Sequence, residues 1–320
     1  MTKNLKKSTV SILDVGVLVL AFNRPEMLVK RIEELSNNKI CNLYISIDGG
    51  SESHNPEMES EKNFARQAFQ KIENFSLKHH KKNLGVDKHT TQEISKVLMN
   101  HQYVIIIEDD VKVTGNFIEN MVNGINIQNQ LGINGIISGW SPLYAKKPNN
   151  KWRTTTYPFV WGWACSSKIW DEFAYDLSKT NIESQLLCSQ KWHKLSNHNK
   201  NKYLLMFKKF QLNPQDTWDV PFLFLFFRKN YISLCPVFSI VGNEGFDDKR
   251  ATHTKGKIPR TIMNNKLNNS VLSKLSVYSI IYKIADQVYA NDVRIVRKFI
   301  NFFKLTCPTV TNKRSKKHNY

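Results

Sequence analysis

Several hallmarks of common protein classes are missing from this sequence of 320 residues. Its five cysteines are scattered and never spaced C-x-x-C, which argues against a disulfide framework and against a zinc site. A reducing, cytoplasmic compartment fits this cysteine usage best. No stretch reaches the roughly 18 apolar residues that a membrane span requires. The glycine patterns G-x-G-x-x-G and G-x-x-x-x-G-K-S/T are also absent, so neither a dinucleotide-binding fold nor a P-loop is indicated.

Acidic residues are scarce as well. The chain carries 46 Lys and Arg against 27 Asp and Glu, a formal net charge of +19. This excess predicts an acidic partner, whether nucleic acid, anionic membrane or phosphorylated substrate, and charge alone does not choose among them. With 41% hydrophobic and 11% aromatic residues, the composition is that of a globular protein able to bury a full core.

The first 110 residues alternate between strand-like and helix-like patterns. Apolar runs at 16–22 and 43–47 have the length of buried strands, and a third short strand is expected at 76–80. Helical spacing follows the first strand, and helices are also expected over about 58–74 and 88–100. A repeated strand–helix order predicts a parallel sheet with right-handed crossovers, which is an α/β fold.

The most informative stretch is YVIIIEDDV, where a buried-strand run leads directly into Glu108, Asp109 and Asp110. Acids at the carboxyl end of a central strand lie where open α/β sheets bind ligands. Their oxygens suit Mg²⁺ or Mn²⁺, which take one or two carboxylates together with substrate phosphates. If the backbone stays extended, Glu108 and Asp110 share one face and Asp109 points to the other. The alternative is an acidic loop that merely ends a strand.

The second half of the chain is less regular. Residues 180–211 are polar, rich in lysine and weakly periodic, and we expect helical insertions there. The other elements expected are a helix at 115–128, a strand at 134–139, an aromatic, β-prone stretch at 152–164, a helix at about 166–177, a hydrophobic helix at 220–227 and a strand at 231–241.

From about residue 262 the sequence turns rich in Asn, Ser and Lys and then becomes amphipathic. We therefore divide the chain into a domain at 1–262 and a basic amphipathic helical extension and tail at 263–320. Basic side chains from Lys283 to Lys304 interleave with apolar ones. Such a helix lies on an anionic membrane surface or packs against its own domain or a partner, and the pattern does not choose.

Several short motifs stand in a characteristic order: AFNRP at 21–25, IDGG at 47–50, NLG at 83–85, EDD at 108–110, VWGWA at 160–164, WD at 218–219, GNEGF at 242–246 and ATHT at 251–254. Over roughly residues 15–257 this order resembles GT-A-fold glycosyltransferases, in particular bacterial surface-glycan sugar transferases. It is also similar to animal N-acetylglucosaminyltransferase I, whose metal motif is Glu-Asp-Asp. The resemblance implies a GT-A (nucleotide-diphospho-sugar transferase) fold, with a mostly parallel central sheet flanked by helices and a helical C-terminal extension.

The resemblance implies a nucleotide-sugar donor, with UDP as the expected nucleotide. Arg24 would contact the nucleotide or its diphosphate, Asp48 would recognise the base, and Asp109 would lie near the ribose or the sugar. The remaining donor contacts that it implies come from Asn83, Lys88 and His89, from the turn of Gly162 and Trp163, and from His253. The residues alone leave open that Trp163 is simply packed and that His253 is an exposed loop histidine.

The implied cofactor is Mn²⁺ or Mg²⁺. Asp110 would ligate it between the two phosphates, with Glu108 in support. Such an ion stabilises the charge that grows on a nucleotide diphosphate as the sugar leaves. Asp219 would be the catalytic base that takes the acceptor's proton, and its alternative role is a helix cap. Val220 departs from the animal enzyme, which has a second acid there.

The first hypothesis is therefore a metal-dependent, inverting hexosyl- or N-acetylhexosaminyltransferase. It would act on a hydroxyl of a glycan or lipid-linked acceptor in the synthesis of a surface polysaccharide such as capsule or lipopolysaccharide, as a peripheral protein on the cytosolic face of a membrane. The second, a sugar-activating nucleotidyltransferase, should carry a Gly-rich basic signature where residues 23–25 stand. The third is a non-catalytic nucleic-acid-binding protein. We expect no nucleic acid, because the acids at 108–110 would repel a phosphate backbone.

Overall fold

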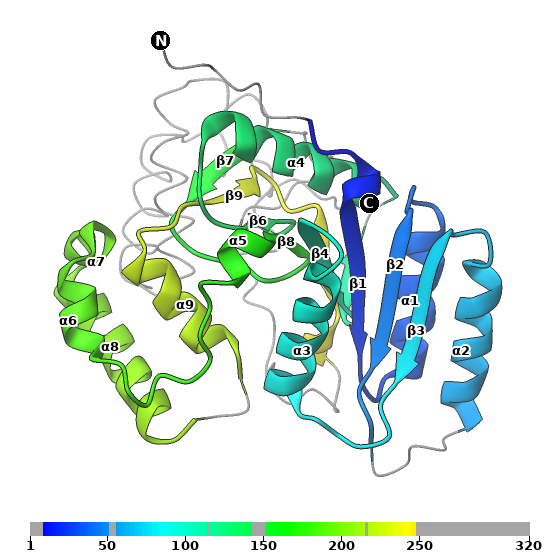
Figure 1. The fold of residues 1–320 in the computed structure, drawn as a ribbon, viewed down its shortest axis with the longest axis horizontal. Helices are drawn as coiled ribbons and strands as arrows, with labels where there is room; N and C mark the ends of the chain where they lie inside the picture. The colour runs from blue at the N-terminus through cyan, green and yellow to red at the C-terminus, as the bar shows by residue number, and fades with distance from the viewer. Residues whose placement is uncertain (1–8, 51–55, 114, 143–150, 215–216, 248–320) are drawn as a thin grey trace, which may run out of the picture. The chain divides into compact units, whose positions relative to one another are not determined.

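The computed structural model describes residues 9–50, 56–113, 115–142, 151–214 and 217–247. Within these ranges the chain forms a central sheet of strand order β3-β2-β1-β4-β8-β6-β9-β7, and a separate ribbon pairs β5 with β10 (Figure 1). The strands are β1 (Val15–Ala21), β2 (Asn42–Ile47), β3 (Asn74–His79), β4 (Tyr103–Glu108), β5 (Val111–Val113), β6 (Ile137–Ser138), β7 (Trp152–Thr155), β8 (Trp163–Ser166), β9 (Ser233–Pro236) and β10 (Val241–Asn243). The helices are α1 (Pro25–Ser36), α2 (Pro56–Ala68), α3 (Val86–Leu98), α4 (Phe117–Leu131), α5 (Ser167–Trp170), α6 (Ile182–Leu187), α7 (Gln190–Lys194), α8 (Asn197–Leu212) and α9 (Asp219–Arg228), with 3-10 turns at Ile12–Asp14 and Gly245–Asp247.

The N-terminal half of the sheet follows the predicted strand–helix order. Every residue of β1 is buried, and β1 pairs in parallel with both β2 and β4, so it forms the centre of this half. β3 extends the sheet at its edge. Pro25 begins α1 at a position where its missing N–H costs no helical hydrogen bond. The predicted α/β class, a mostly parallel central sheet flanked by helices, is confirmed, and it is consistent with the GT-A fold.

Three elements of the second half differ from the prediction. The helix expected at 166–177 is the single turn α5, and beyond it Glu172 accepts a 2.7 Å hydrogen bond from Tyr231 Oη. The strand expected at 231–241 is divided. Its first part, β9, pairs with β6 and β7 in the central sheet, whereas β10 pairs with β5 in the ribbon. The strand expected at 134–139 is reduced to β6.

Helices α6, α7 and α8 occupy the segment where the sequence predicts helical insertions. Each begins at a polar residue whose side chain accepts a hydrogen bond from the backbone N–H three positions later; these residues are Asn181, Ser189 and Ser196. These caps explain how a weakly periodic segment forms three separate helices. Among the described residues, no helix is both long enough and apolar enough to cross a membrane. The predicted boundary at 262 and the extension at 263–320 lie outside the described residues.

An aromatic cluster joins β8 to α9. The side chain of Trp163 is 0% exposed and stacks on Trp218, with ring centroids 5.2 Å apart and 16° between the planes. Phe222 packs against both rings, with centroid distances of 5.5 Å. Aromatic side chains bury large apolar areas and prefer such defined geometries. The cluster therefore fixes the first turn of α9 on the sheet, and with it the position of Asp219.

A buried cation ties α1 to the ribbon. Arg31, which is 0% exposed, donates through Nη2 to Glu34 Oε1 at 3.2 Å and to Glu244 Oε2 at 3.1 Å. The other oxygen of Glu34 accepts the backbone N–H of Val113 at 2.9 Å. A buried charge is tolerated when partners compensate it. Glu244, to which the sequence assigns no role, therefore helps to hold the chain beyond β10 against α1.

The ion pairs of Arg31 predict that substitutions of Glu244 and of Arg31 lower the free energy of unfolding by different amounts. Glu244→Ala should lower the free energy of unfolding by about 1–3 kcal/mol, because the buried guanidinium loses one of its carboxylates. Arg31→Met should cost less, because its two carboxylates are 23% and 33% exposed and become hydrated once the cation is gone. Urea unfolding of both variants measures the difference. An equal or larger loss in Arg31→Met would contradict this account.

Candidate active site

Three carboxylates lie at the carboxyl end of β4. The strand ends at Glu108, the chain turns at Asp109 and Asp110, and β5 begins at Val111. The backbone is therefore not extended at these residues, so the alternation of faces that an extended chain would give does not apply, and β5 leaves the central sheet to pair with β10. Both aspartates consequently bind the same guanidinium group, that of Arg24. Arg24 Nη1 donates to Asp110 Oδ2 at 3.1 Å, and its Nη2 donates to Asp109 Oδ1.

Burial and mutual repulsion make Glu108 and Asp109 reluctant to ionise. Loss of hydration, followed by the charges of Asp110 and Asp109, raises the pKa of Glu108 to about 8. Loss of hydration also raises the pKa of Asp109 to about 6, against the opposing charge of Arg24. The charge of Asp219 adds to the increase in the pKa of Glu108, so α9 brings its first residue near the same cluster. Negative charge is in excess here, and a further cation would be stabilised.

Asp110 has the features of a metal ligand. Its Oδ1 atom is buried and has no hydrogen-bond partner among the described residues. The backbone N–H of Glu244 donates to its carbonyl at 2.8 Å, and a Cβ at Gly245 would collide with its Oδ2. In the part of the chain that the structure describes, no group of three or more His, Cys, Asp or Glu side chains could hold a metal. Mg²⁺ and Mn²⁺ take one or two carboxylates with water and phosphate, so the unpartnered Oδ1 of Asp110 could serve as one ligand of such an ion.

Asp219 comes from the other half of the chain. It is exposed, it is the first residue of α9, and Thr217 Oγ1 donates a hydrogen bond to its Oδ1. Trp218 occupies the N-cap position, and no side chain caps this helix, so the cap alternative for Asp219 has no support. An exposed carboxylate beside buried ones is suited to take a proton from a ligand hydroxyl. Thr217 orients this carboxylate through that hydrogen bond.

The carboxylate of Asp48 organises a turn at the same edge of the sheet. It accepts backbone N–H groups from Gly49 at 2.8 Å, Leu84 at 2.9 Å and Gly85 at 3.2 Å. These bonds tie the end of β2 to the start of α3. Asn83 and Lys88 are exposed beside this turn, and Asn83 Oδ1 accepts the N–H of Gly85 at 2.7 Å. The structure thus places these three predicted nucleotide contacts together, with Asp48 already engaged by backbone.

Three other residues that the sequence predicts to contact the donor lie inside the protein. His89 is 5% exposed and lies 2.8 Å, through Nε2, from Ser46 Oγ. Trp163 is enclosed by the aromatic cluster. Gly162 has a positive φ of 54°, and a Cβ there would press on Val241 and Phe117. The side chains of His89 and Trp163 therefore offer little surface to a ligand and support the fold. His253 lies outside the described residues.

The aromatic side chain of this turn that keeps partial exposure is Trp161. It packs edge-to-face on Trp140, with centroids 5.0 Å apart, and on Phe246, at 5.6 Å. Phe246 follows Gly245, which lies against Asp110, so this aromatic group adjoins the acids. Trp161 and Trp163 flank one glycine, and the sequence offers no signal to tell which of the two faces inward.

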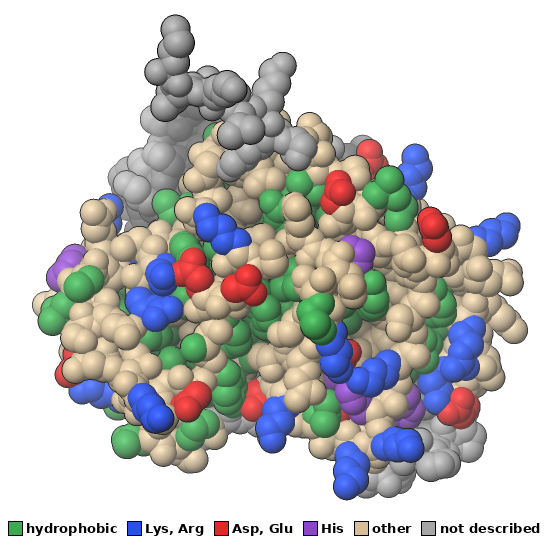
Figure 2. All heavy atoms as spheres, viewed as in Figure 1, with side chains coloured by type: hydrophobic (Ala, Val, Ile, Leu, Met, Phe, Trp, Pro, Cys, Tyr) green, Lys and Arg blue, Asp and Glu red, His purple; other side chains and the backbone are tan. Residues whose placement is uncertain are grey.

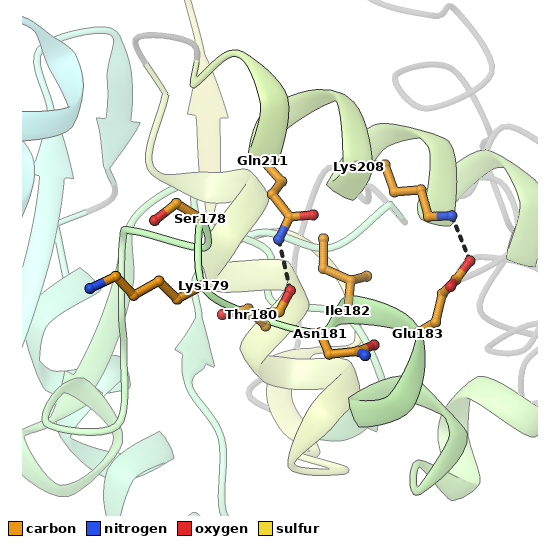
Figure 3. A pocket seen from close by; sticks show the side chains of 8 residues that line it. All are labelled: Ser178, Lys179, Thr180, Asn181, Ile182, Glu183, Lys208 and Gln211. Atoms are coloured by element: carbon orange, nitrogen blue, oxygen red, sulfur yellow. Dashed lines mark hydrogen bonds and ion pairs between the residues drawn. The ribbon is translucent and has the colours of Figure 1, made fainter.

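An open hollow of about 380 Å³ lies elsewhere, between the segment before α6 and the C-terminal end of α8 (Figure 3). Its lining is mostly polar and consists of Ser178, Lys179, Thr180, Asn181, Ile182, Glu183, Lys208 and Gln211. None of the residues predicted for the donor, the metal or catalysis lines it.

Comparisons with known proteins found no matching family model. No curated protein matches the chain. Among solved structures, the chain is similar to TarS of S. aureus at 8% identity and a TM-score of 0.37, over 51% of this chain and 30% of that one. It is also similar to the mannosyltransferase PcManGT from Pyrobaculum calidifontis, in complex with GDP-Man and Mn²⁺, at 10% identity and a TM-score of 0.38, over 88% of this chain and 86% of that one. The chain spans less than a third of TarS, and at such TM-scores neither likeness carries an argument about activity.

The buried His89 predicts a pH dependence of stability. Burial lowers its pKa to about 4, so the imidazole stays neutral in the folded protein where it is protonated in the unfolded chain. Between roughly pH 6.5 and 4 His89 binds a proton in the unfolded chain but not in the folded protein, so the contribution of this histidine to stability is lost as the pH falls. His89→Gln should flatten this part of the pH profile from urea unfolding. His198→Gln, at an exposed site on α8, should leave the profile unchanged. An unaltered slope in His89→Gln would refute the assignment.

Proposed function

We propose that this chain is a metal-dependent GT-A glycosyltransferase that moves a sugar from a nucleotide-diphosphate donor to a hydroxyl group. The observation that carries the proposal is the pairing of Arg24 with Asp109 and Asp110 at the carboxyl end of β4, where the charge of Asp219 also raises the pKa of Glu108. There Asp110 Oδ1 has no hydrogen-bond partner within the described residues. Open α/β sheets bind their ligands at this edge, and the turn that Asp48 organises lies along it.

The reaction breaks the bond between the anomeric carbon and a diphosphate oxygen and forms a bond from that carbon to the acceptor oxygen. Negative charge grows on the leaving diphosphate, which Arg24 would stabilise. A divalent cation held by Asp110 and Glu108 would add Lewis-acid stabilisation of the same charge. Asp219 would take the acceptor's proton, a contribution of ~10²–10⁴-fold in rate. Direct attack by the acceptor inverts the anomeric centre.

The finer assignment is a UDP-linked donor, a hexosyl or N-acetylhexosaminyl group, and a glycan or lipid-linked acceptor in surface-polysaccharide synthesis. The motif resemblance over residues 15–257 supports it. The location proposed with it is the cytosolic face of a membrane. A pocket that recognises UDP would combine the exposed residues Asn83 and Lys88 with Arg24, all at the same edge of the sheet.

Incubation with a panel of nucleotide sugars and Mn²⁺, with nucleotide release as the readout, tests this proposal. We expect release from one donor class, loss of release in EDTA, and a reduction of about 10²–10³-fold in Asp110→Ala, as for other losses of transition-state charge stabilisation. Glu119→Gln, at an exposed carboxylate on α4, is the matched control and should retain full activity. Release that persists in both EDTA and Asp110→Ala would exclude the metal assignment.

Asp219→Asn separates binding from chemistry. The substitution keeps the shape of the side chain but removes the proton acceptor, so transfer should fall by ~10²–10⁴-fold. Calorimetric titration with the nucleotide diphosphate and Mn²⁺ should give the same affinity as the wild type. A variant that transfers at the normal rate, or that loses nucleotide affinity instead, would rule out Asp219 as the base.

A further inference from the structure

We propose that the outward side of α8 binds an anionic membrane surface. We call this surface the α8 face and define it by His198, Lys202, Leu205, Lys209 and Leu212. These residues recur every three or four positions, so they share one side of the helix, and all are exposed. This surface is separate from the basic extension at 263–320. The inference does not depend on the proposed catalytic activity.

The α8 face exposes large apolar side chains. Leu205 is 69% exposed and Leu212 is 86% exposed. The contact of α8 with α9 uses its opposite side, through Tyr203 and Phe207, so these leucines are not needed for that contact. Leu187, at the end of the neighbouring α6, is a further leucine with 64% exposure. Figure 2 shows hydrophobic side chains beside Lys or Arg side chains, with acidic side chains among them, on the surface over α6 to α8.

Lysines predominate around this face, and the acid on neighbouring α6, Glu183, is paired with Lys208. Residues 184–215 contain six lysines and no acidic residue. Lys202 and Lys209 lie on the face itself, on the same side of the helix as the two leucines. Apolar groups that insert at the boundary between headgroups and acyl chains, with lysines directed at anionic headgroups, are the two components of interfacial membrane binding.

The hollow at the C-terminal end of α8 extends the same surface. Lys208 and Gln211 form one wall and point toward the segment 178–183 (Figure 3). Lys208 pairs with Glu183 at 2.5 Å, and Gln211 donates to two backbone carbonyls of the opposite wall, each at 2.7 Å. The lining therefore combines hydroxyl and amide groups with two lysines and the carboxylate of Glu183.

Other occupants of the α8 face fit less well. A surface for nucleic acid combines basic residues with stacking aromatics, whereas the exposed apolar groups here are leucines. The amphipathic segment 283–304 of this chain contains five basic and two acidic residues, so its net charge has the same sign as the face. A second copy of the chain would bring the same lysines opposite one another. An anionic bilayer complements both the charge and the apolar groups.

Vesicle co-sedimentation of the full chain tests the proposal. We expect binding to vesicles of phosphatidylglycerol and phosphatidylcholine, weaker binding as salt rises, and little binding to phosphatidylcholine alone. The double variants Leu205→Gln/Leu212→Gln and Lys202→Gln/Lys209→Gln should each bind about tenfold more weakly. The segment 263–320 is present in every variant, so the differences report on α8.

The matched control for the leucine variant is Leu131→Gln/Met99→Gln, because these side chains are 60% and 76% exposed and lie outside α8. The matched control for the lysine variant is Lys168→Gln, at an exposed lysine of α5. These should bind as the wild type does. Unchanged binding of both α8 double variants, or a wild type that ignores phosphatidylglycerol, would overturn the proposal. Displacement of the vesicles by an oligonucleotide would also overturn the proposal. The same holds if an α8 double variant alters the oligomeric state but not vesicle binding. Donor and acceptor are absent from the assay, so its failure is distinct from a failure of the catalytic proposal.

Discussion

The ion pairs of Arg24 with Asp109 and Asp110 join the first strand–helix connection to the end of the central strand. Both aspartates are buried, and buried carboxylates are tolerated where a counter-charge compensates them. Arg24 immediately precedes α1, and the aspartates immediately precede β5, so the pairs hold these elements in a defined relation. Arg31, further along α1, repeats the arrangement with Glu244. Together the two arginines build a frame of α1, β5 and β10 around the acids.

The other half of the site depends on apolar contacts instead. The stack of Trp163 on Trp218 attaches α9 to β8, and Asp219 follows directly in the chain. The two halves therefore contribute different chemistry. The first supplies buried acids whose protons are retained to unusually high pH, and the second supplies an exposed carboxylate open to a ligand. Helix α8 packs on the same α9, so the proposed membrane surface is attached to the helix that begins with Asp219.

Continuous apolar patterns were sufficient to locate the strands of the parallel half. β1 and β4 are covered on both faces, so their sequences are almost continuous apolar runs, and in β2 the stretch from Leu43 to Ile47 is interrupted only by Ser46. The position of Glu108, Asp109 and Asp110 followed from the same rule, because residues after such a strand lie at the ligand-binding edge. Helical insertions were expected over residues 180–211, but their division into separate helices that begin at Ser189 and Ser196 was seen only in the structure.

Features that depend on distant partners were decided by tertiary structure alone. The turn at Asp109 and Asp110 exists because β5 pairs with β10 from the far end of the domain, a pairing that no local pattern encodes. Whether Trp163 or Trp161 enters the core depends on the position of α9. The engagement of Asp48 with three backbone N–H groups depends on how α3 meets β2. The sequence by itself determined which residues carry charge at the end of a buried strand. Packing decided which of them point together, because side-chain direction is set by contacts between elements rather than by order along the chain.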